Sequence, residues 1–394
     1  MSDNVKKKVF VGLSGGVDSA VSAYLLVQQG YDVEGVFIQT WTPEWMECGW
    51  RDDRRDAMRV AIHLGIPFHD LDLSREYKEG VADYMISEYR AGRTPNPDVM
   101  CNREVKFGGF LRYALSRGAD YVATGHYARV SDSRPSLRGG LGRGVSNIKI
   151  QPVLETSAQP PLTPPLEREG NLHLLKGLDT TKDQSYFLWT LTNEQLKHVL
   201  FPVGGLPKSE TRKIAERAAL PVATKKDSQG ICFLGAIDME EFLSHYIEHK
   251  IGNILDVTGN KIGTHTGVWF VTLGQRFAGD IIDSEYRGKP LFVTAKDTEH
   301  NTITVSLNKE DVEVINSNEL HLESVVFRHH IESGKEYTCQ VRYHGEFHEV
   351  EVVSYSESGV AATIRFTNQS HLAAPGQSIV LYDADVCIGG GIIA

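Results

Sequence analysis

The 394-residue sequence contains only five cysteines, and no two of them form a Cys-x-x-Cys pair. A small, odd and dispersed set argues against a disulfide scaffold and against a structural zinc site. Isolated cysteines in such a protein are usually small buried residues. We therefore expect Cys48, Cys339 and Cys387, which fall in no chemical motif, to be buried or incidental thiols.

The sequence also lacks any long hydrophobic run. No stretch approaches the ~20 uninterrupted apolar residues that a membrane-spanning helix needs. The basic N-terminal residues run directly into the first expected strand, so they do not resemble a secretory signal. We expect a cytoplasmic protein with no membrane partner. At 41% hydrophobic and 23% charged residues, the composition is ordinary for a globular protein of two or three domains.

A third missing feature is an excess of positive charge. The formal net charge of −10 argues against a protein that grips nucleic acid by bulk electrostatics. Basic residues are nevertheless concentrated in two stretches. The first contains Arg134, Arg138, Arg143 and Lys149, and the second contains Lys208, Arg212, Lys213, Arg217, Lys225 and Lys226. The second stretch spans an expected helix, and it fits a solvated helix face as well as a local binding surface.

The most informative segment is a glycine-rich loop that contains no lysine. Its residues are Gly12, Leu13, Ser14, Gly15, Gly16, Val17, Asp18 and Ser19. No Gly-Lys-Ser/Thr follows, so it is not a Walker A loop. An apolar run precedes it and a helix-like stretch follows, and this order directs backbone N–H groups and a helix dipole towards a phosphate. The serines add hydroxyl donors, and Asp18 could hold Mg²⁺ or orient a donor.

The first part of the chain alternates strand and helix signals. Strands are expected at residues 9–13, 32–38, 67–72 and 119–124, and helices at 20–27, 54–64, 77–90, 184–200, 208–219 and 238–249. Repeated strand–helix units predict a doubly wound parallel sheet of the α/β class, with the ligand at the carboxyl ends of the strands. The glycine loop and the Gly125-His126 pair both follow strand ends, where this rule places a ligand.

The rest of the chain has a different pattern. Residues 131–170 have the glycine and proline density of an unfolded surface insertion. Strands are expected at 268–272, 291–294 and 302–306, and six later β runs between 320 and 388 predict a small antiparallel barrel. We therefore predict a catalytic domain at 1–236 that includes the insertion, a central domain at 237–310 and a C-terminal β-barrel at 311–394.

Two cysteines lie in segments that look chemical. Cys101 stands three residues after Asp98, in a loop fixed by two prolines and just before a helix-like segment. A helix N-terminus with Arg103 and Lys106 nearby would lower the pKa of a thiol and favour the thiolate. Cys232 follows a flexible glycine turn next to a pair of lysines. The sequence spacing alone does not show that the two thiols meet, and an inert thiol is the more common case for each.

Several motifs occur together in a characteristic order and spacing: SGGVDS, NPDVMCNREVKF, ATGHYA, KDQSYFL, DSQGICF, QVRY and PGQSIVLYDADVCIGGGII. In this combination the chain resembles the tRNA-specific 2-thiouridylase family (MnmA type), within the PP-loop ATP pyrophosphatase superfamily. Apart from the 131–170 insertion, the resemblance extends over nearly the whole chain. It implies a PP-loop domain of the adenine nucleotide alpha hydrolase-like type, followed by a small central domain and a C-terminal antiparallel β-barrel.

The resemblance also implies roles for individual residues. The glycine loop, Ile38 and Gly125 are similar to the ATP site. Cys101 resembles the nucleophile, and Cys232 the cysteine that carries a persulfide. Asp98 resembles a residue that orients the base or handles a proton, next to Asn96 and Pro97 in the loop that meets the base. The positions similar to tRNA contacts are Asn96, Pro97, Asp98, His126, Lys182, Asp183, Gln184, Arg342, Tyr343 and Gln377.

The implied reaction is the ATP-dependent conversion of the wobble uridine of tRNA to 2-thiouridine. Adenylation of the C2 oxygen, with Mg²⁺ bound transiently with ATP, would make that oxygen a good leaving group. The sulfur would come from a cysteine persulfide, loaded by a cysteine desulfurase or a relay protein. Direct persulfide attack and prior release of hydrosulfide both remain open, and both leave a Cys101–Cys232 disulfide. The target base would be unstacked in the anticodon loop.

Two other classes of function fit parts of the sequence. A PP-loop ligase or amidotransferase acting on a small molecule would use the glycine loop but would need no cysteine pair. A non-catalytic RNA-binding protein would keep only the nucleotide fold. Activity that survives loss of Cys101 would favour the ligase, and tRNA binding without ATP turnover would favour the RNA-binding protein.

Overall fold

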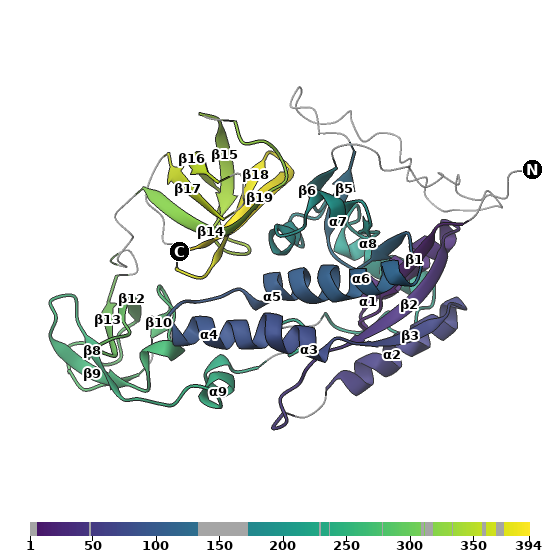
Figure 1. Cartoon of the computed structure of the whole chain (residues 1–394). Coiled ribbons are helices and arrows are strands. Elements are labelled where there is room, and N and C mark those ends of the chain that lie inside the picture. The colour runs from purple at the N-terminus through teal and green to yellow at the C-terminus, as the bar shows by residue number, and fades with distance from the viewer. Residues whose placement is uncertain are drawn as a thin grey trace, which may run out of the picture. The chain divides into compact units, whose positions relative to one another are not determined.

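The structure is a computed structural model that describes residues 6–46, 49–132, 172–227, 230–235, 237–277, 279–308, 311, 318–332, 334–356, 360–367 and 374–394 (Figure 1). Cys48 and nearly all of the expected 131–170 insertion lie outside these residues. The chain forms two compact units. The first comprises Met1–Glu76, Asn102–Ser228 and Tyr382–Ile388, and the second comprises Tyr77–Cys101, Gln229–Leu381 and Gly389–Ala394.

The first unit is built on a parallel sheet, as the alternating pattern predicts. Its strand order is β3-β2-β1-β4-β7, and each strand runs parallel to its neighbours. The strands are β1 (Lys8–Gly12), β2 (Asp32–Gln39), β3 (Phe68–Asp72), β4 (Tyr121–Ala123) and β7 (Val199–Leu200). Strand β1 is central and its apolar residues are buried, which is typical of a sheet covered on both faces.

Helices cover both faces of this sheet. Successive side chains of β1 point to opposite faces, so each face presents apolar residues for a helix to cover. Val9 and Val11 pack into a core shared with helix α1 (Val17–Gln28) and helix α2 (Trp50–Leu64). Phe10 points to the other face, where its ring lies 6.1 Å from that of Tyr113. Tyr113 belongs to α6 (Phe110–Ser116), which continues the turn α5 (Pro97–Met100) and the π-helical segment η2 (Cys101–Gly109).

The prediction of one helix at residues 184–200 is wrong. It contains a 3-10 turn, η3 (Ser185–Leu188), a single helical turn, α7 (Asn193–Leu196), and strand β7. The chain turns at Thr192, whose hydroxyl accepts a hydrogen bond from the Gln195 N–H at 3.2 Å in a capping box. Leu188, Trp189 and Leu191 are buried, so the apolar spacing reflects a buried loop. Helix α8 (Lys208–Arg217) follows close to the expected place.

The second unit begins with a helical segment and a small β domain. The helical part is η1 (Lys78–Asp83), α4 (Tyr84–Arg90) and α5, and a further helix, α9 (Met239–Ser244), comes later. The sheet has the order β10-β12-β13-β8-β9-β11. Its strands are β8 (Gly252–Leu255), β9 (Lys261–His265), β10 (Arg276–Phe277), β11 (Asp280–Ile281), β12 (Leu291–Asp297) and β13 (Thr302–Ser306). Residues 268–272, expected as a strand, instead contain the 3-10 turn η4 (Val268–Phe270), because the Asn301 side chain accepts the Val268 N–H at 3.1 Å.

Six strands near the C-terminus close into the expected antiparallel barrel. They are β14 (Glu319–Phe327), β15 (Glu336–Gln340), β16 (His348–Tyr355), β17 (Ala361–Phe366), β18 (Ser378–Asp383) and β19 (Val386–Ile393). Their order is β14-β17-β16-β15-β18-β19, and pairing of β14 with β19 closes the ring. Cys339 and Cys387 are fully buried, as expected for packing residues.

A short antiparallel pair completes the first unit. Strands β5 (Ala128–Ser131) and β6 (His173–Lys176) pair with each other, and β6 also pairs with Val386 and Cys387. Within the part of the chain that the structure describes, none of the helices has the length and apolarity to cross a membrane.

Candidate active site

The glycine loop connects β1 to α1 and is shaped by close backbone approaches. Gly15 has φ +74°, and a Cβ there would lie 2.4 Å from the backbone oxygen of Asp53. A Cβ at Gly125 would lie 2.7 Å from the backbone nitrogen of Ser19 and 2.8 Å from the carbonyl carbon of Asp18. Glycine is therefore required at both positions. The structure thus brings Gly125 against the loop, as expected for two ligand-facing turns.

Bonds within the loop hold its backbone in place. The Ser14 N–H donates to Ser19 Oγ at 3.2 Å, and Ser19 Oγ donates to the Gly16 carbonyl at 3.2 Å. Leu13 and Val17 are buried and anchor the loop in the core. Ile38, at the end of the neighbouring strand, is also buried, and its Cδ1 would be 4.0 Å from a Cβ at Gly12. All the residues expected around the nucleotide therefore lie at one end of the sheet.

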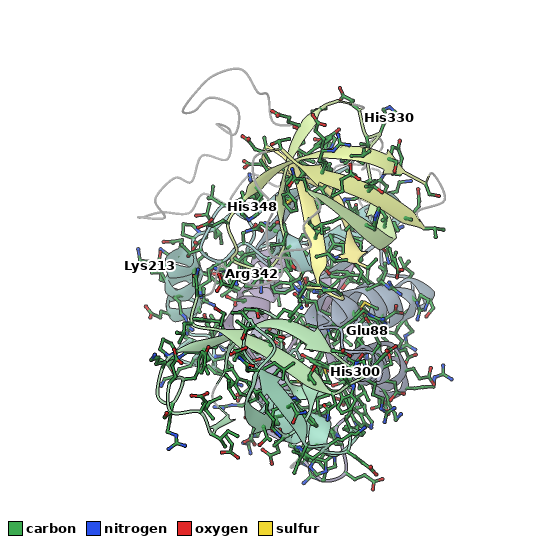
Figure 2. The ribbon with its side chains drawn as sticks, turned by 90° about the vertical axis from the view of Figure 1, so that its left-hand side faces the viewer. Glu88, Lys213, His300, His330, Arg342 and His348 are labelled. Atoms are coloured by element: carbon green, nitrogen blue, oxygen red, sulfur yellow. The ribbon has the colours of Figure 1, made fainter. Side chains whose placement is uncertain are left out.

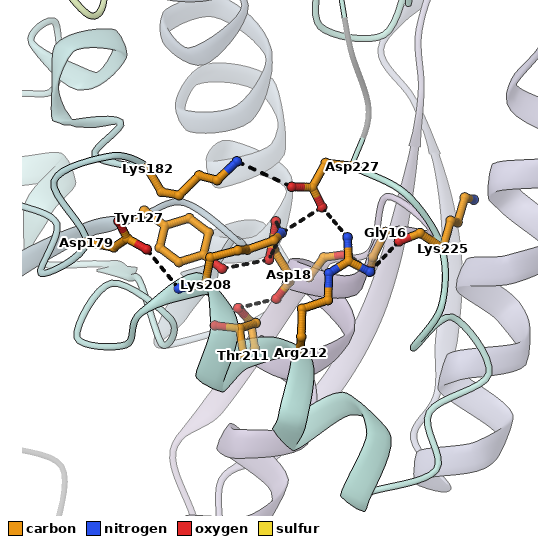
Figure 3. Close-up of polar contacts among 12 residues, drawn as sticks. Gly16, Asp18, Tyr127, Asp179, Lys182, Lys208, Thr211, Arg212, Lys225 and Asp227 are labelled. Atoms are coloured by element: carbon orange, nitrogen blue, oxygen red, sulfur yellow. Dashed lines mark hydrogen bonds and ion pairs between the residues drawn. The ribbon is translucent and has the colours of Figure 1, made fainter.

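A cluster of charged side chains lies beside the loop (Figure 3). Lys208 Nζ, from the start of α8, is 2.7 Å from Asp18 Oδ1 and 2.8 Å from Asp227 Oδ1. Arg212, one turn further along, contacts the same Asp227 oxygen. The Tyr127 hydroxyl donates to Asp18 Oδ1 at 2.8 Å. Burial raises the pKa of Asp227, but Lys208, Arg212 and Lys182 more than offset this and hold the pKa below its usual value.

Sequence reasoning missed the place of Lys208 and Asp227 in this cluster. Both belong to segments singled out for other reasons, the basic stretch and the motif around Cys232. Lys213 and Arg217, on the same helix as Lys208, are exposed and pair with Glu210. One face of the α8 helix in the basic stretch is therefore solvated, and another face lines the glycine-loop site. The position of a residue around the helix decides which face it occupies.

Three consecutive residues expected to contact tRNA have different surroundings. Asp183 is partly buried and accepts hydrogen bonds from the Gly177 N–H at 2.8 Å and the Ser185 hydroxyl at 2.9 Å. Burial raises its pKa, and these bonds only partly offset the rise. Gln184 Oε1 accepts the Tyr127 N–H at 3.0 Å. The Lys182 ammonium is partly exposed and lies 3.5 Å from Asp227 Oδ2.

His126, the fourth expected tRNA contact in the first unit, is buried. Its Nδ1 is 2.7 Å from the Thr124 hydroxyl, and its ring packs near Phe107 and Phe201. Burial and, to a smaller extent, the Lys106 charge lower the pKa of His126 well below its usual value. The imidazole is therefore neutral near pH 7.

The two motif cysteines converge in the second unit. Asn96 caps the helical turn that begins at Pro97, with its side-chain oxygen accepting the Val99 N–H at 3.2 Å. In that turn, Asp98 Oδ1 accepts the backbone N–H of Cys232 at 2.9 Å. Cys101 follows one turn later and is fully buried. The loop containing Cys232 is therefore held at the start of the helix that carries Cys101.

Tyr77 holds the same loop from its other side. Its hydroxyl donates to the Cys232 carbonyl at 2.9 Å. The pKa of Tyr77 is raised, first by burial and then by negative charge at Cys101, Cys232 and Asp98. Hydrogen bonds thus join Tyr77 and Asp98 to the backbone of Cys232, a proximity that sequence spacing did not reveal. Tyr77 carried no sequence signal.

The remaining expected tRNA contacts lie in the second unit. Gln377 Nε2 donates to the Thr94 carbonyl at 2.7 Å, and the Thr94 N–H donates to the Pro375 carbonyl at 2.9 Å. Gln377 thereby holds the loop that leads to Asn96. Arg342 is exposed in the loop after β15 (Figure 2), and the ring of the neighbouring Tyr343 lies 4.0 Å from that of His344. Among the described residues, no group of three or more His, Cys, Asp or Glu side chains is placed to hold a metal ion.

The chain matches known protein families along most of its length. Three family models match consecutive parts of the chain: a tRNA methyl transferase HUP domain at residues 7–236, a tRNA methyl transferase PRC-barrel domain at 240–307 and an aminomethyltransferase beta-barrel domain at 317–393. The chain is similar to the tRNA-specific 2-thiouridylase MnmA of Enterococcus faecalis, with 41% identity over 100% of this chain and 96% of the relative. It is 40% identical to the protein of the same name from Pediococcus pentosaceus, with the same coverage.

Among solved structures, the U34-tRNA thiolase NcsA of Methanococcus maripaludis with its [4Fe-4S] cluster shares 18% identity. The match covers 62% of this chain and 66% of that one, with a TM-score of 0.32. A likeness at this level is too weak to support a conclusion about fold or function.

Proposed function

The chain belongs to the family of tRNA-specific 2-thiouridylases, and we propose that it converts a uridine of tRNA to 2-thiouridine with ATP and a persulfide sulfur. It is a tRNA-uridine 2-sulfurtransferase. One observation carries the proposal. Asp98 and Tyr77 both hydrogen-bond to the backbone of Cys232, and Asp98 lies one helical turn before Cys101. A ligase or a methyltransferase that uses no sulfur would not need two thiols gathered in this way.

The first step is activation of the uridine. The C2 oxygen attacks the α-phosphorus of ATP, the bond to the β-phosphate breaks, and pyrophosphate leaves. Backbone N–H groups at the start of α1 and the dipole of that helix suit the departing anion. Mg²⁺ would come with the nucleotide and neutralise phosphate charge. Asp18 is the loop carboxylate that fits such an ion, with Ile38 and Gly125 flanking the nucleotide.

The second step replaces oxygen by sulfur. In one route, the terminal sulfur of a Cys232 persulfide attacks C2 and AMP leaves with the original oxygen. The Cys101 thiolate then attacks the Cys232 sulfur, the S–S bond to the product breaks, and 2-thiouridine is released with a Cys101–Cys232 disulfide. In the other route, Cys101 attacks the Cys232 sulfur first and releases hydrosulfide, which attacks C2 as AMP leaves with the original oxygen. Both routes need an external thiol to reduce the disulfide before the next turnover.

The proposed partners are tRNA, through its wobble uridine in the anticodon loop, and a protein that loads sulfur onto Cys232. Cys232 is partly exposed and Cys101 is buried, which suits a carrier that meets a donor and a nucleophile that does not. Asn96, Pro97 and Asp98 would meet the base, and His126, Lys182, Asp183, Gln184, Arg342, Tyr343 and Gln377 would contact or organise the tRNA surface. Asp183, Gln184 and Gln377 would act mainly by holding backbone.

The proposal predicts a particular split of ATP. With tRNA present, the enzyme should release AMP and pyrophosphate, and a tRNA already thiolated at the wobble uridine should not stimulate the reaction. Thin-layer separation of products from α-labelled ATP measures this directly. Release of ADP, or AMP formation that needs a small carboxylate or amide in place of tRNA and persists in Cys101→Ser, would favour the ligase alternative.

Binding of tRNA is expected to weaken steeply with salt. A protein of net charge −10 must contact phosphates through a few local cations, and each contact releases counterions. Between 50 and 200 mM KCl we expect affinity to fall about tenfold or more. Filter binding at several salt concentrations gives the slope, and affinity that is independent of salt would contradict the tRNA assignment.

Tyr77→Phe is expected to slow sulfur transfer several-fold while leaving ATP binding unchanged. The substitution removes the hydroxyl that fixes the Cys232 carbonyl, at a cost of about 1 kcal/mol for one buried hydrogen bond. Single-turnover transfer from preloaded persulfide should slow more than the loading of sulfur. A matched control is Tyr89→Phe, because Tyr89 is a buried tyrosine of α4 outside this cluster. Equal transfer rates in Tyr77→Phe and wild type would remove Tyr77 from the account.

A further inference from the structure

The glycine loop carries no positive charge of its own. None of residues 12–19 is lysine or arginine, whereas a Walker A loop supplies a lysine to the β- and γ-phosphates. Release of pyrophosphate concentrates negative charge at this loop, and backbone N–H groups alone provide only partial charges. A side-chain cation from elsewhere in the fold would add to the charge that Mg²⁺ brings with the nucleotide.

Lys208 is placed to supply that charge. Its ammonium lies 2.7 and 2.8 Å from the two carboxylate oxygens of Asp18, inside the loop, and only 13% of its side chain is exposed. The side chain lies over the ring of Tyr127, with Nζ 5.7 Å from the ring centroid. These contacts join α8 to a loop that is far away in sequence (Figure 3).

The start of α8 is fixed so that Lys208 points at the loop. Pro207 precedes it with φ −65° and cannot leave that range, and the Lys208 N–H donates to Asp179 Oδ2 at 2.9 Å. That bond is the first cause of the lowered pKa of Asp179, so the capping carboxylate stays ionised. The backbone and the ammonium of Lys208 are thus held by different acidic residues.

Three cations gather around one carboxylate beside the loop. Lys208, Arg212 and Lys182 all contact Asp227, and Lys208 also contacts Asp18. Phosphate oxygens compete well for an ammonium that already binds carboxylate oxygens. With ATP bound, Asp18 would be the carboxylate available to a Mg²⁺ ion that accompanies the nucleotide, and the Lys208 ammonium would face the phosphates. Asp227, held by Arg212, keeps the lysine within reach.

We propose that Lys208 of α8 supplies the cation that the glycine loop lacks, binding the β- and γ-phosphates of ATP and stabilising pyrophosphate as it leaves. Arg212 and Asp227 act as positioning residues. The proposal rests on the proposed function for the identity of the nucleotide, and it adds a phosphate-binding residue that lies outside the loop and the motifs of the sequence.

The test compares Lys208→Gln with Lys213→Gln, the same substitution on the exposed side of the same helix (Figure 2). Calorimetry with Mg²⁺ and pyrophosphate, ATP or AMP measures each affinity. We expect Lys208→Gln to weaken pyrophosphate and ATP ~10- to 100-fold, the range of one lost charge-assisted hydrogen bond, and to leave AMP within about twofold. Lys208→Arg should retain part of the affinity, and Lys213→Gln should bind like wild type.

Unchanged pyrophosphate and ATP affinity in Lys208→Gln would overturn the proposal, as would an equal loss for AMP. If Lys208→Gln does not fold, Lys208→Arg carries the test, because it keeps a cation beside Asp18 and Asp227 with a different shape, and pyrophosphate affinity equal to wild type in that variant would overturn the proposal. Thiolation by wild type separates the two proposals. If wild type thiolates tRNA but Lys208→Gln binds pyrophosphate as tightly as wild type, only the role of Lys208 is rejected. If pyrophosphate binding depends on Lys208 but wild type does not thiolate tRNA, only the proposed function is rejected.

Discussion

Cys232→Ser is expected to abolish 2-thiouridine formation, with a loss of at least about a thousandfold, because a hydroxyl cannot carry sulfane sulfur. ATP binding should be unchanged, since the glycine loop and the residues that contact it do not include Cys232. The loss is measured by nucleoside mass spectrometry of tRNA after incubation with ATP, Mg²⁺ and a persulfide donor. Cys48→Ser, which changes a cysteine outside both motifs, serves as the matched control and should retain wild-type activity.

Cys101→Ser gives a second, different result in the same assay. It should accept a persulfide on Cys232 but fail to release free product. Under direct attack, tRNA becomes trapped on the protein through a disulfide and is freed by dithiothreitol. Under prior reduction, no covalent tRNA forms, and added sulfide restores thiolation. Full activity of either serine variant with persulfide as sole sulfur source would contradict the role assigned to the cysteine that the variant lacks.

Gly125→Ala is expected to reduce ATP turnover about a hundredfold or more without unfolding the protein. The new Cβ would lie 2.7 Å from the Ser19 nitrogen and 2.8 Å from the carbonyl carbon of Asp18, so the backbone of the glycine loop must move. A displacement of about 1 Å in a positioned site costs on the order of a hundredfold in rate. Pyrophosphate release in the presence of tRNA measures the effect, and thermal melting reports the fold.

Gly205→Ala is the matched control for that substitution. It lies in the same unit, and a Cβ there meets no atom within 4 Å. Both variants lose the same backbone freedom in the unfolded chain, so their difference isolates the steric effect on the loop. Equal turnover in Gly125→Ala and Gly205→Ala would show that Gly125 does not shape the nucleotide site.

Local sequence patterns were sufficient for much of the fold. The strand, glycine loop and helix at residues 8–28 follow from adjacent signals, and so do the parallel sheet and the six-stranded barrel. Patterns failed where tertiary contacts decide. The apolar spacing at 184–200 reflects a buried irregular segment around Trp189, and the turn at 268–270 depends on Asn301, which lies far along the chain.

The candidate site also contains residues that local motifs identify and residues that only the packing of distant segments identifies. The loop residues and Cys101 were recognised from motifs, because the chemistry of each motif is local. The contacts of Cys232 with Tyr77 and Asp98 depend on how distant segments pack, so spacing could not reveal them. Lys208 was part of a recognised basic stretch, but only the helix position distinguishes it from exposed Lys213.

The central claim is that this chain moves sulfur from a Cys232 persulfide to C2 of the wobble uridine in an ATP-dependent reaction. The most direct measurement loads ³⁴S onto Cys232 and follows one turnover on unmodified tRNA by nucleoside mass spectrometry. The account predicts ³⁴S-labelled 2-thiouridine at the wobble position, in an amount equal to the AMP released, and none without ATP. Thiolation with unlabelled sulfur, or AMP release with no 2-thiouridine, would contradict it.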